Sequence, residues 1–519
     1  MALAKTYSIG LLGLTGTVIE VEADISAQLP AFVLVGLPDA SLAEATSRVR
    51  AACANIGQGL PSKKVVVNLS PASVPKSGAG FDLAIAVAVL GAMGVVDAAR
   101  LKSAVFIGEL GLDGSVRSVP GVLPATLAAR DAGFERIFVP AGNLAEACLV
   151  AGIVSHGVSG LGQLLAHLRD GMELVAGVSL PGPGEALGAG TSGQAGSLLD
   201  LSQVIGQDVA VEGLIVAAAG GHHLSLIGAP GSGKTMLAER LPTILPRLTV
   251  EQSLEVAAVE SIVGDGQSAI ALNLNPRFVA PHHTSSMAAL IGGGSGSPRP
   301  GAVSRAHHGV LFLDEALEFH GATLDGLREP LESGKVQVHR AAGSARFPAR
   351  FQLVLAANPC PCGMLGVSGR ECKCTVPSIR RYSSRLSGPI LDRIDIRLAI
   401  KPVSIAAAAG LSEAGTNSAT AAARVLAARQ ASAARLKSYG VQLNAHLPGP
   451  VLRKDFKPSP RVLRELDRML ASGRASMRGY DRCLRLAWTL ADLDGATSPS
   501  LEHIQAAVSL RGTDDLAGA

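Results

Sequence analysis

The order of apolar and polar positions divides the chain into three parts. In residues 1–170, short runs of β-branched residues alternate with stretches of helical spacing, which predicts an α+β domain. A second pattern, of α/β type, runs through residues 201–402, and residues 403–519 have helical spacing. Residues 171–200 are rich in glycine and lack apolar periodicity, which is typical of a flexible linker. We expect strands at 16–21, 31–35, 65–69, 104–107 and 137–139, and helices at 43–56, 82–96 and 419–437.

Length and composition agree with a multidomain, folded chain. The 519 residues suffice for about three domains of typical size, and 48% hydrophobic against 17% charged residues argues against disorder. The longest apolar run, residues 83–96, is shorter than the roughly 18 residues that cross a bilayer, and the first residues lack a secretory signal pattern. We therefore expect a cytoplasmic protein without membrane contact. An odd number of cysteines, seven, agrees with a reducing compartment.

A glycine-rich loop in the second part predicts a nucleotide site. An apolar run at 224–227 leads into Gly-Ala-Pro-Gly-Ser-Gly-Lys-Thr, and a helical pattern follows. In such a loop the glycines let backbone N–H groups face phosphates, the lysine neutralises their charge and the hydroxyl binds Mg²⁺. The alternative is a purely structural glycine turn, which is disfavoured because a chance match to the whole pattern is rare and an apolar strand precedes it. The residues expected to bind ATP and Mg²⁺ are Gly228, Gly231, Gly233, Lys234 and Thr235.

Two further apolar runs end in polar residues that suit phosphate chemistry. Residues 310–313 precede Asp314 and Glu315; the first would hold Mg²⁺ and the second would polarise the attacking water. Alone, such a pair could merely cap a helix. Residues 351–357 end at Asn358, whose amide could hold both the γ-phosphate and the water, or which could simply be a turn residue before proline.

These motifs resemble those of a known family. Together with the runs 282–294, 298–301, 327–334 and 382–395, they are similar to AAA+ ATPases of the magnesium-chelatase-like group, in its ComM/YifB branch, over nearly the whole chain. The resemblance implies a central P-loop AAA+ domain, a C-terminal helical lid and a homo-hexameric ring. It also implies a DNA helicase that promotes branch migration during natural transformation or recombination. The alternative is a motor that remodels a protein partner, as in magnesium chelatase.

The resemblance also implies roles for four polar residues. Asn358 would be sensor 1, and Arg478 would be sensor 2 on the lid. Arg393 would reach the γ-phosphate of a neighbouring subunit, which makes hydrolysis depend on assembly and favours a closed ring. The alternative for Arg393 is an ordinary ion pair with Asp392 or Asp395. Gln207 would lie near the adenine.

A basic hairpin is the candidate DNA contact. Residues 171–327 hold six Lys or Arg against 14 Asp or Glu, whereas residues 328–397 hold 12 against five. The stretch 335–351 looks like a β-hairpin, and in related ATPases such hairpins line the central pore together with an insert like 282–301. With only 3% aromatic residues, contact through phosphate charge is favoured over base stacking. The candidates are Lys335, Arg340, Arg346 and Arg350; alternatively these cations bridge subunits or face solvent.

Four cysteines form a second cluster of interest. Cys360, Cys362, Cys372 and Cys374 have the pattern C-x-C…C-x-C, and four thiolates at this spacing can close a tetrahedral Zn²⁺ site. The alternative is four reduced thiols in a loop. The doublets at 282–283 and 307–308 are interpreted as pore or turn histidines and not as ligands, because adjacent residues do not share a helix face.

The motifs at residues 68–72, 75–83, 108–114 and 140–147 of the first domain resemble the proteolytic fold of Lon-type proteases. Those enzymes use a Ser-Lys dyad, but Ser77 is offset from the position of the nucleophile. No lysine occurs between Lys102 and Lys234, so the lysine of the dyad, which lies later in the domain than the serine, is missing. A serine nucleophile here would lack its base. We therefore expect an inactive Lon-like domain that serves assembly or DNA contact.

Overall fold

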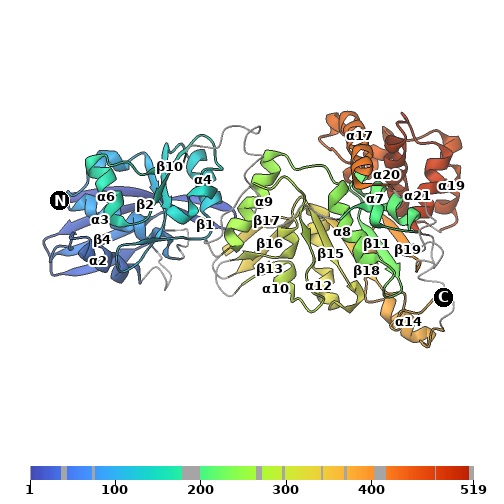
Figure 1. Cartoon of the computed structure of the whole chain (residues 1–519), viewed down its shortest axis with the longest axis horizontal. Coiled ribbons are helices and arrows are strands. Elements are labelled where there is room, and N and C mark those ends of the chain that lie inside the picture. Colours follow the sequence, from blue (N-terminus) through green and yellow to red (C-terminus); the bar gives the residue numbers. More distant parts are fainter. Residues whose placement is uncertain are drawn as a thin grey trace.

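The computed structural model describes residues 2–36, 44–72, 76, 78–177, 199–264, 272–294, 298–340, 343–366, 371–402, 416–473 and 475–512. The chain is elongated, with the N-terminal sheet at one end, a second sheet in the middle and the C-terminal helices at the other end (Figure 1). This arrangement agrees with the predicted α/β class and the helical C-terminal part. Within the described residues, no helix combines the length and apolar character needed to cross a membrane. Ser77 and most of the predicted linker, residues 178–198, lie outside the described residues.

An eight-stranded mixed sheet organises the N-terminal part, in the order β10-β9-β8-β5-β1-β2-β4-β3. Successive strand residues face opposite sides. Phe106 and Phe138 therefore join a core with α2, α3 and α6, whereas Val105 and Val139 join another with α4 and α5. The strands are β1 (Ala2–Leu12), β2 (Thr15–Ser26), β3 (Ala31–Val35), β4 (Lys64–Ser70), β5 (Ala104–Phe106), β8 (Arg136–Pro140), β9 (Val154–Val158) and β10 (Val175–Gly177). The helices are α2 (Ala45–Asn55), α3 (Asp82–Ala92), α4 (Val122–Asp131), α5 (Leu144–Ala147) and α6 (Leu161–Asp170).

All five strands and both helices predicted in this part are present, with ends that differ by a few residues. One predicted boundary needs correction. Strand β10 pairs antiparallel with β9, so the sheet extends to Gly177, into the range 171–200 that was assigned to the linker.

A five-stranded parallel sheet forms the middle part, in the order β12-β15-β18-β11-β19. Parallel strands are covered on both faces and therefore read as continuous apolar runs; all four residues of β15 are buried. The carboxyl ends of β11, β18 and β15 lie next to one another, so the polar residues that follow these strands meet. The strands are β11 (Leu224–Gly228), β12 (Phe278–Val279), β15 (Val310–Leu313), β18 (Gln352–Ala357) and β19 (Ile396–Ile400). Its main helices are α7 (Asp208–Gly220), α8 (Lys234–Ile244) and α9 (Val250–Val263).

Smaller elements surround this sheet. The strands β13 (Gly292–Gly293) and β14 (Arg299–Pro300) form one two-stranded sheet, and β16 (Lys335–Arg340) and β17 (Gly343–Pro348) form the predicted hairpin. The short helices are α10 (Met287–Leu290), α11 (Ala302–Arg305), α12 (Gly321–Asp325), α13 (Arg328–Ser333), α14 (Val376–Ser383) and α15 (Gly388–Leu391).

The C-terminal helices share one hydrophobic core with the middle sheet, because α17 and α20 pack against α7. A buried polar network crosses the same boundary. His222 follows α7, and its ring contacts Asp395 before β19 (Nδ1 to Oδ2, 3.0 Å) and Thr489 on α20 (Nε2 to Oγ1, 2.8 Å). Arg482 on α20 completes the network by donating to Asp395. The helices are α17 (Ser418–Leu436), α18 (Gly449–Lys454), α19 (Pro460–Ala471), α20 (Met477–Leu493) and α21 (Leu501–Arg511).

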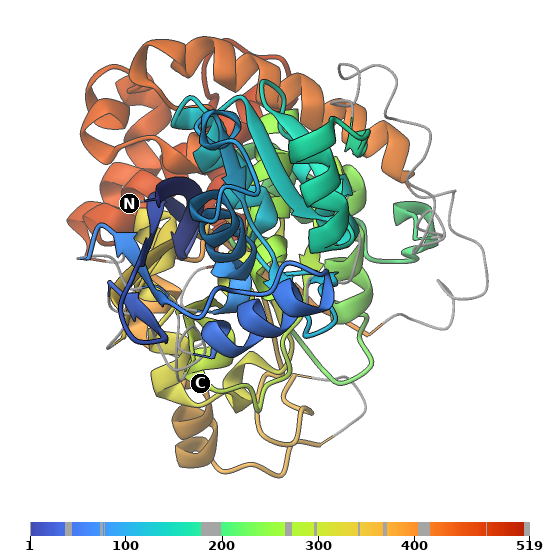
Figure 2. The ribbon, with the colours of Figure 1, turned by 90° about the vertical axis from the view of Figure 1, so that its left-hand side faces the viewer.

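Among the described residues, the N-terminal part contacts the middle part at two places. Figure 2 shows the N-terminal part in front of the other parts when the molecule is viewed from that end. At the first place, α4 packs against α9. The Ser261 hydroxyl on α9 donates to the buried Glu146 carboxylate (2.8 Å), and the backbone carbonyl of Ser261 accepts the N–H of Gly121 (2.8 Å). At the second place, the turn between β1 and β2 packs against β17. Gly13, at φ +63°, lies so close to Ala345 that an added Cβ would be 2.9 Å from its methyl carbon.

Candidate functional site

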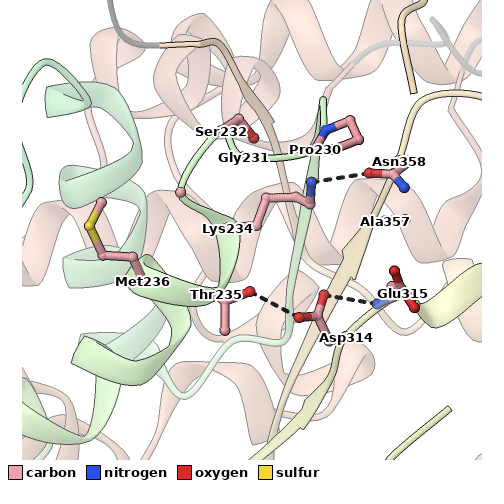
Figure 3. A pocket seen from close by; sticks show the side chains of 11 residues that line it. Pro230, Gly231, Ser232, Lys234, Thr235, Met236, Asp314, Glu315, Ala357 and Asn358 are labelled. Carbon is pink, nitrogen blue, oxygen red and sulfur yellow. Dashed lines mark hydrogen bonds between the residues drawn. The ribbon is translucent and has the colours of Figure 1, made fainter. Parts of the chain in front are cut away.

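The predicted ATP site is a pocket of about 440 Å³ at the carboxyl edge of the middle sheet (Figure 3). The loop between β11 and α8 forms one wall, and the ends of β15 and β18 form the other. The pocket is lined by residues 230–236, Asp314, Glu315, Ala357 and Asn358. Sequence motifs that lie far apart along the chain therefore meet in one place.

Three glycines permit the path of this loop. Gly231 and Gly233 have φ values of +74° and +91°, in the left-handed region that glycine adopts without strain. At Gly228, an added Cβ would lie 2.4 Å from the carbonyl oxygen of Ile400, so the loop passes too close to β19 for a side chain. The loop leads directly into α8, whose first three residues line the pocket, so the N-terminus of this helix borders it as in known phosphate sites.

Lys234 is held at the centre of the loop. Its Nζ donates to the carbonyls of Gly228 (2.8 Å) and Ala229 (2.9 Å) and to Oδ1 of Asn358 (3.2 Å). Burial lowers the pKa of Lys234, although Asp314 and Glu315 act in the opposite direction. Figure 3 shows the ammonium and the Asn358 amide pointing toward each other across the pocket. An incoming γ-phosphate would meet both groups together.

The side-chain oxygen atoms of Thr235 and Asp314 lie where they could bind a magnesium ion. The Thr235 hydroxyl donates to Oδ2 of Asp314 at 2.9 Å, and Oδ1 of Asp314 accepts the backbone N–H of Glu315, also at 2.9 Å. Mg²⁺ is usually bound by one or two protein oxygens together with phosphates and waters. The pair fits this requirement, because both oxygens border the same pocket.

Glu315 is held in an unusual backbone conformation. Its φ of +49° lies in the left-handed region, and outside glycine only His308 shares this property among the described residues. Such strain persists where the surroundings enforce it, and it is frequent at functional sites. The Glu315 carboxylate meets an imidazole: Nδ1 of His283 lies 3.1 Å from Oε2. The sequence did not predict this contact, because His283 was interpreted as a pore or turn residue.

Arg393, Arg478 and Gln207 do not line the pocket of their own chain. Arg393 pairs with Glu332 and also donates to the carbonyl of Pro389. The alternative ion pairs predicted for Arg393, with Asp392 or Asp395, are therefore wrong. Asp395 bonds Arg482 and His222, as described above, and Asp392 lies 3.9 Å from the exposed Arg478.

Gln207 contacts the phosphate-binding loop between β11 and α8. Its Nε2 donates to the carbonyl of Lys401 (2.6 Å), and the carbonyl of Ser232 lies 3.4 Å away. Gln207 is 8% exposed, so its amide is occupied by the chain itself. The structure thus shows a residue that fixes the loop to the end of β19, and its predicted place beside the adenine stays a prediction.

The basic hairpin has one buried and one exposed face. Val336, Val338, Ala345 and Phe347 are buried in the core around the end of the middle sheet, and the residues between them face outward. The exposed face carries Lys335, Gln337, His339, Ser344 and Arg346, and Arg340 ends β16. Arg350 lies beyond β17 at the base of the hairpin, so it does not belong to this face.

The four cysteines converge as their spacing predicted. The Sγ atom of Cys360 lies 3.4 Å from Sγ of Cys362 and 3.6 Å from Sγ of Cys372. The Sγ atoms of Cys362 and Cys372 are 3.7 Å apart. Cys374 belongs to the same group, in which all four Sγ atoms lie within 4.8 Å of one another. A disulfide would require about 2.05 Å. Tetrahedral coordination with Zn–S bonds of about 2.3 Å places sulfur atoms about 3.8 Å apart, close to the observed separations.

A second cluster, of Glu255 with the histidine doublet at 307–308, does not fit a metal. Both Nε2 atoms lie close to Oε2 of Glu255, at 2.9 and 2.8 Å, and His308 has a φ of +55°. Nδ1 of His307 accepts the backbone N–H of Arg350 at 3.0 Å. Burial lowers the pKa of His307 to about 4, so the ring is neutral and its single proton sits on Nε2. A metal-binding nitrogen would need the opposite tautomer.

The strand β11, its phosphate-binding loop, the helix α8 and the carboxylates at the end of β15, with β18 between the two strands, together define a P-loop ATPase of the AAA+ type. Comparisons agree with this class. The family model "Magnesium chelatase, subunit ChlI" matches residues 200–408, "Subunit ChlI of Mg-chelatase" matches 21–143, and the C-terminal model of the same subunit matches 415–511.

Three similar proteins match this chain over nearly its full length. An uncharacterized protein of Mycobacterium tuberculosis is 48% identical over 513 residues, 99% of each chain. YifB of Escherichia coli is 39% identical over 520 residues, covering 99% of this chain and 98% of its own, and the competence protein ComM of Haemophilus influenzae is 38% identical over 511 residues, 98% of each. The chain therefore belongs to the magnesium-chelatase-like ComM/YifB family.

Proposed function

We propose that this ATPase assembles into a hexameric ring that moves on DNA and promotes branch migration during natural transformation or recombination. One observation carries the proposal: a single domain combines the ATP pocket with a hairpin that is anchored by a buried apolar face and presents Lys335 and Arg346 on the other. Cations on a firmly anchored hairpin suit the phosphate backbone, which is recognised through charge with little dependence on base sequence. The similarity to ComM, which is named a competence protein, supports the proposed role in natural transformation.

In the proposed hydrolysis, the pocket residues divide the work. Lys234 and the loop N–H groups hold the β- and γ-phosphates; Thr235 and Asp314 would hold the Mg²⁺, which would supply positive charge to the phosphate oxygens. Glu315 accepts a proton from water as the water oxygen bonds to the γ-phosphorus. The bond from that phosphorus to the bridging oxygen then breaks, and ADP leaves with the electron pair. Asn358 orients the water and the γ-phosphate.

The two outlying arginines favour assembly. Arg478 approaches Asp392, the residue directly before Arg393, so both arginines lie in one region outside their own pocket. We propose that this region faces the pocket of the next subunit, where Arg393 stabilises the transition state and Arg478 contacts the nucleotide. A head-to-tail interface of this kind closes into a ring.

Zinc is proposed as a structural cofactor of the four cysteines. The loop that carries them follows Asn358, and Gly363 in it lies against the P-loop: an added Cβ there would be 2.5 Å from Cδ of Pro230. A metal at Cys360 would therefore hold a long irregular loop against the nucleotide site. Metal analysis should find one zinc per chain, and Cys362→Ser should lose it. Purified protein with far less than one zinc would remove this part of the proposal.

The decisive experiment is ATP-dependent unwinding of a four-way DNA junction by the purified full chain, with Lys234→Ala as the inactive control. We expect unwinding and a DNA-stimulated ATPase for the natural sequence only. Intact hexamers with neither activity would refute the DNA proposal. The match to magnesium chelatase models favours one other candidate, remodelling of a protein partner, in which case a protein and not DNA would stimulate hydrolysis.

A further inference from the structure

A second basic surface lies outside the hairpin, on the end of the cysteine loop and on α14. Residues 371–385 carry four Lys or Arg against one acidic residue. Lys373, Arg380 and Arg381 are exposed, and within the described ranges of the chain no ion pair or side-chain hydrogen bond occupies their cationic groups. The ATP site and the hydrolysis scheme above give no role to these three residues, which we call the α14 cations.

The support under the α14 cations is anchored to the core of the middle part. Tyr382 on α14 is buried, at 6% exposure, and Cζ of Arg385 lies 5.7 Å from the centroid of its ring. Nη1 of Arg385 donates to the carbonyl of Leu317 and to Oε2 of Glu318, both at 2.9 Å. Lys373 is placed from the other side, because the cysteines directly before and after it belong to the thiol cluster. The cations therefore stand on a folded support.

This surface is separate from the basic hairpin. In Figure 1, the strands β16 and β17 lie on the side of the middle part that faces the N-terminal sheet, whereas α14 projects from the opposite side. Figure 2 also shows α14 projecting from the body of the molecule. A strand of nucleic acid that is bound at the hairpin therefore leaves the α14 cations free for another strand.

We propose that the α14 cations form a second DNA-binding surface, which holds the phosphate backbone of a strand or arm other than the one at the hairpin. This inference rests on the proposed function and adds a binding site to it. Fixed cations without counterions on the protein suit a phosphate backbone, since their binding releases the counterions of the DNA. A four-way junction has several arms and can contact both surfaces at once, whereas a short single strand at the hairpin cannot.

The composition of the surface favours DNA over a protein partner. Val376, at 49% exposure, is the one large apolar side chain that residues 371–385 expose. Protein interfaces usually bury an apolar centre that is poor in charged residues and surrounded by a polar rim. Here charged side chains dominate instead, and one sign of charge prevails. The phosphate backbone requires only this positive charge.

The test is the salt dependence of DNA binding by the assembled full chain, measured with a four-way junction and with a short single strand. The double variant Arg380→Gln/Arg381→Gln should lower the slope of log affinity for the junction against log salt by about two, because each phosphate contact contributes about 0.9. Lys373→Gln should lower this slope by about one. For the short single strand, the slope should change by less than about 0.5 in either variant.

Two control variants separate a binding site from a general effect of charge. Arg380→Lys/Arg381→Lys keeps both charges and should keep the slope. Arg461→Gln/Arg464→Gln removes the same net charge from another helix, α19, on which both arginines are exposed, and it should also leave the slope unchanged. The DNA-free kcat should stay within about twofold of that of the natural chain in every variant, because none of these residues lines the ATP pocket.

The outcomes separate this inference from the proposed function. An unchanged junction slope in Arg380→Gln/Arg381→Gln, with a slope that Lys335→Ala does lower, would overturn the inference while the DNA function stands. Equal losses in this variant and in the α19 control would overturn it as well, since net charge alone would explain them. If the variant instead dissociates the hexamers and the junction slope of the remaining hexamers is unchanged, the surface binds the neighbouring subunit and not DNA. A natural chain that binds the junction without unwinding it would remove the proposed motor and leave this site to be judged by its slope.

Discussion

Replacement of Asp395 by asparagine should detach the C-terminal helices from the ATPase core. The Asp395 carboxylate is buried, at 3% exposure, and accepts from Arg482 on one oxygen and from His222 on the other. Burial alone would raise its pKa, but the Arg482 charge and the His222 hydrogen bond hold the pKa of Asp395 well below its ordinary range. Asparagine keeps the volume and removes the charge, which leaves the Arg482 guanidinium, 16% exposed, without its counterion.

The expected cost follows from that unpaired cation. Removing one partner of a buried ion pair costs about 3–5 kcal/mol, a large part of the roughly 5–15 kcal/mol that stabilises a domain. At the low end, the Tm should fall by about 6–12 °C for a domain of this size. Trp488, the only tryptophan, lies on α20, and Cζ of Arg435 on α17 lies 4.4 Å from the centroid of its ring. Its fluorescence therefore reports unfolding of the C-terminal helices.

The matched control is Asp494→Asn, because Asp494 pairs with His503 but is 66% exposed at the surface. Its Tm should change by less than about 2 °C, since exposed pairs contribute little. The double variant with Arg482→Met should recover part of the loss, because no charge then remains unpaired. A Tm for Asp395→Asn equal to that of the control would refute the reasoning.

The effect of pH on this pair has a defined sign. A depressed folded-state pKa means that the Asp395 carboxylate stabilises the fold fully above the ordinary aspartate pKa of 3.8 and loses this contribution as the pH falls further. The difference in Tm between the natural chain and Asp395→Asn should therefore be constant near neutral pH and shrink in acid. A difference that grew on acidification would contradict the assignment.

Three further predictions concern activity. Arg393→Ala in an assembled ring should lower kcat by about 10³-fold or more while ATP still binds, and full turnover would exclude the proposed trans role. Lys335→Ala and Arg346→Ala should each lower the slope of log affinity for DNA against log salt by about one, whereas the neighbouring Gln337→Ala should leave it unchanged; equal slopes would exclude phosphate contact. Thr235→Ala removes one of the two oxygens proposed for Mg²⁺, so the Mg²⁺ concentration for half-maximal ATPase should rise about tenfold, and an unchanged titration would contradict that role.

The sequence predicted those parts of the site that follow from regular structure. Asp314 and Asn358 directly follow apolar strands, and Lys234 follows the glycine loop that continues a third. Parallel strands bring such ends to one edge of a sheet. The convergence of the four thiols likewise follows from their close spacing.

The contacts that were missed depend on irregular backbone. Nothing periodic places His283 beside Glu315, because the segment that carries His283 has no pattern of its own and is positioned by packing on the hairpin. Both histidines at 307–308 contact Glu255, and His308 has a positive φ, which is uncommon outside glycine and which no periodic pattern predicts. Glu332, the partner of Arg393, lies 61 positions earlier in the chain on a short helix.

The contact between α4 and α9 has a consequence for how the ATPase could exist by itself. Ala257 and Ala258 on α9 are buried against the first domain, and Leu12 and Leu14 of that domain cover part of the hairpin core. A truncated chain that began after the first domain would uncover both apolar areas at once, which favours aggregation. The ATPase part should therefore need its N-terminal domain to stay unaggregated, and a transplant of the motor alone onto another domain would need new polar residues on α9.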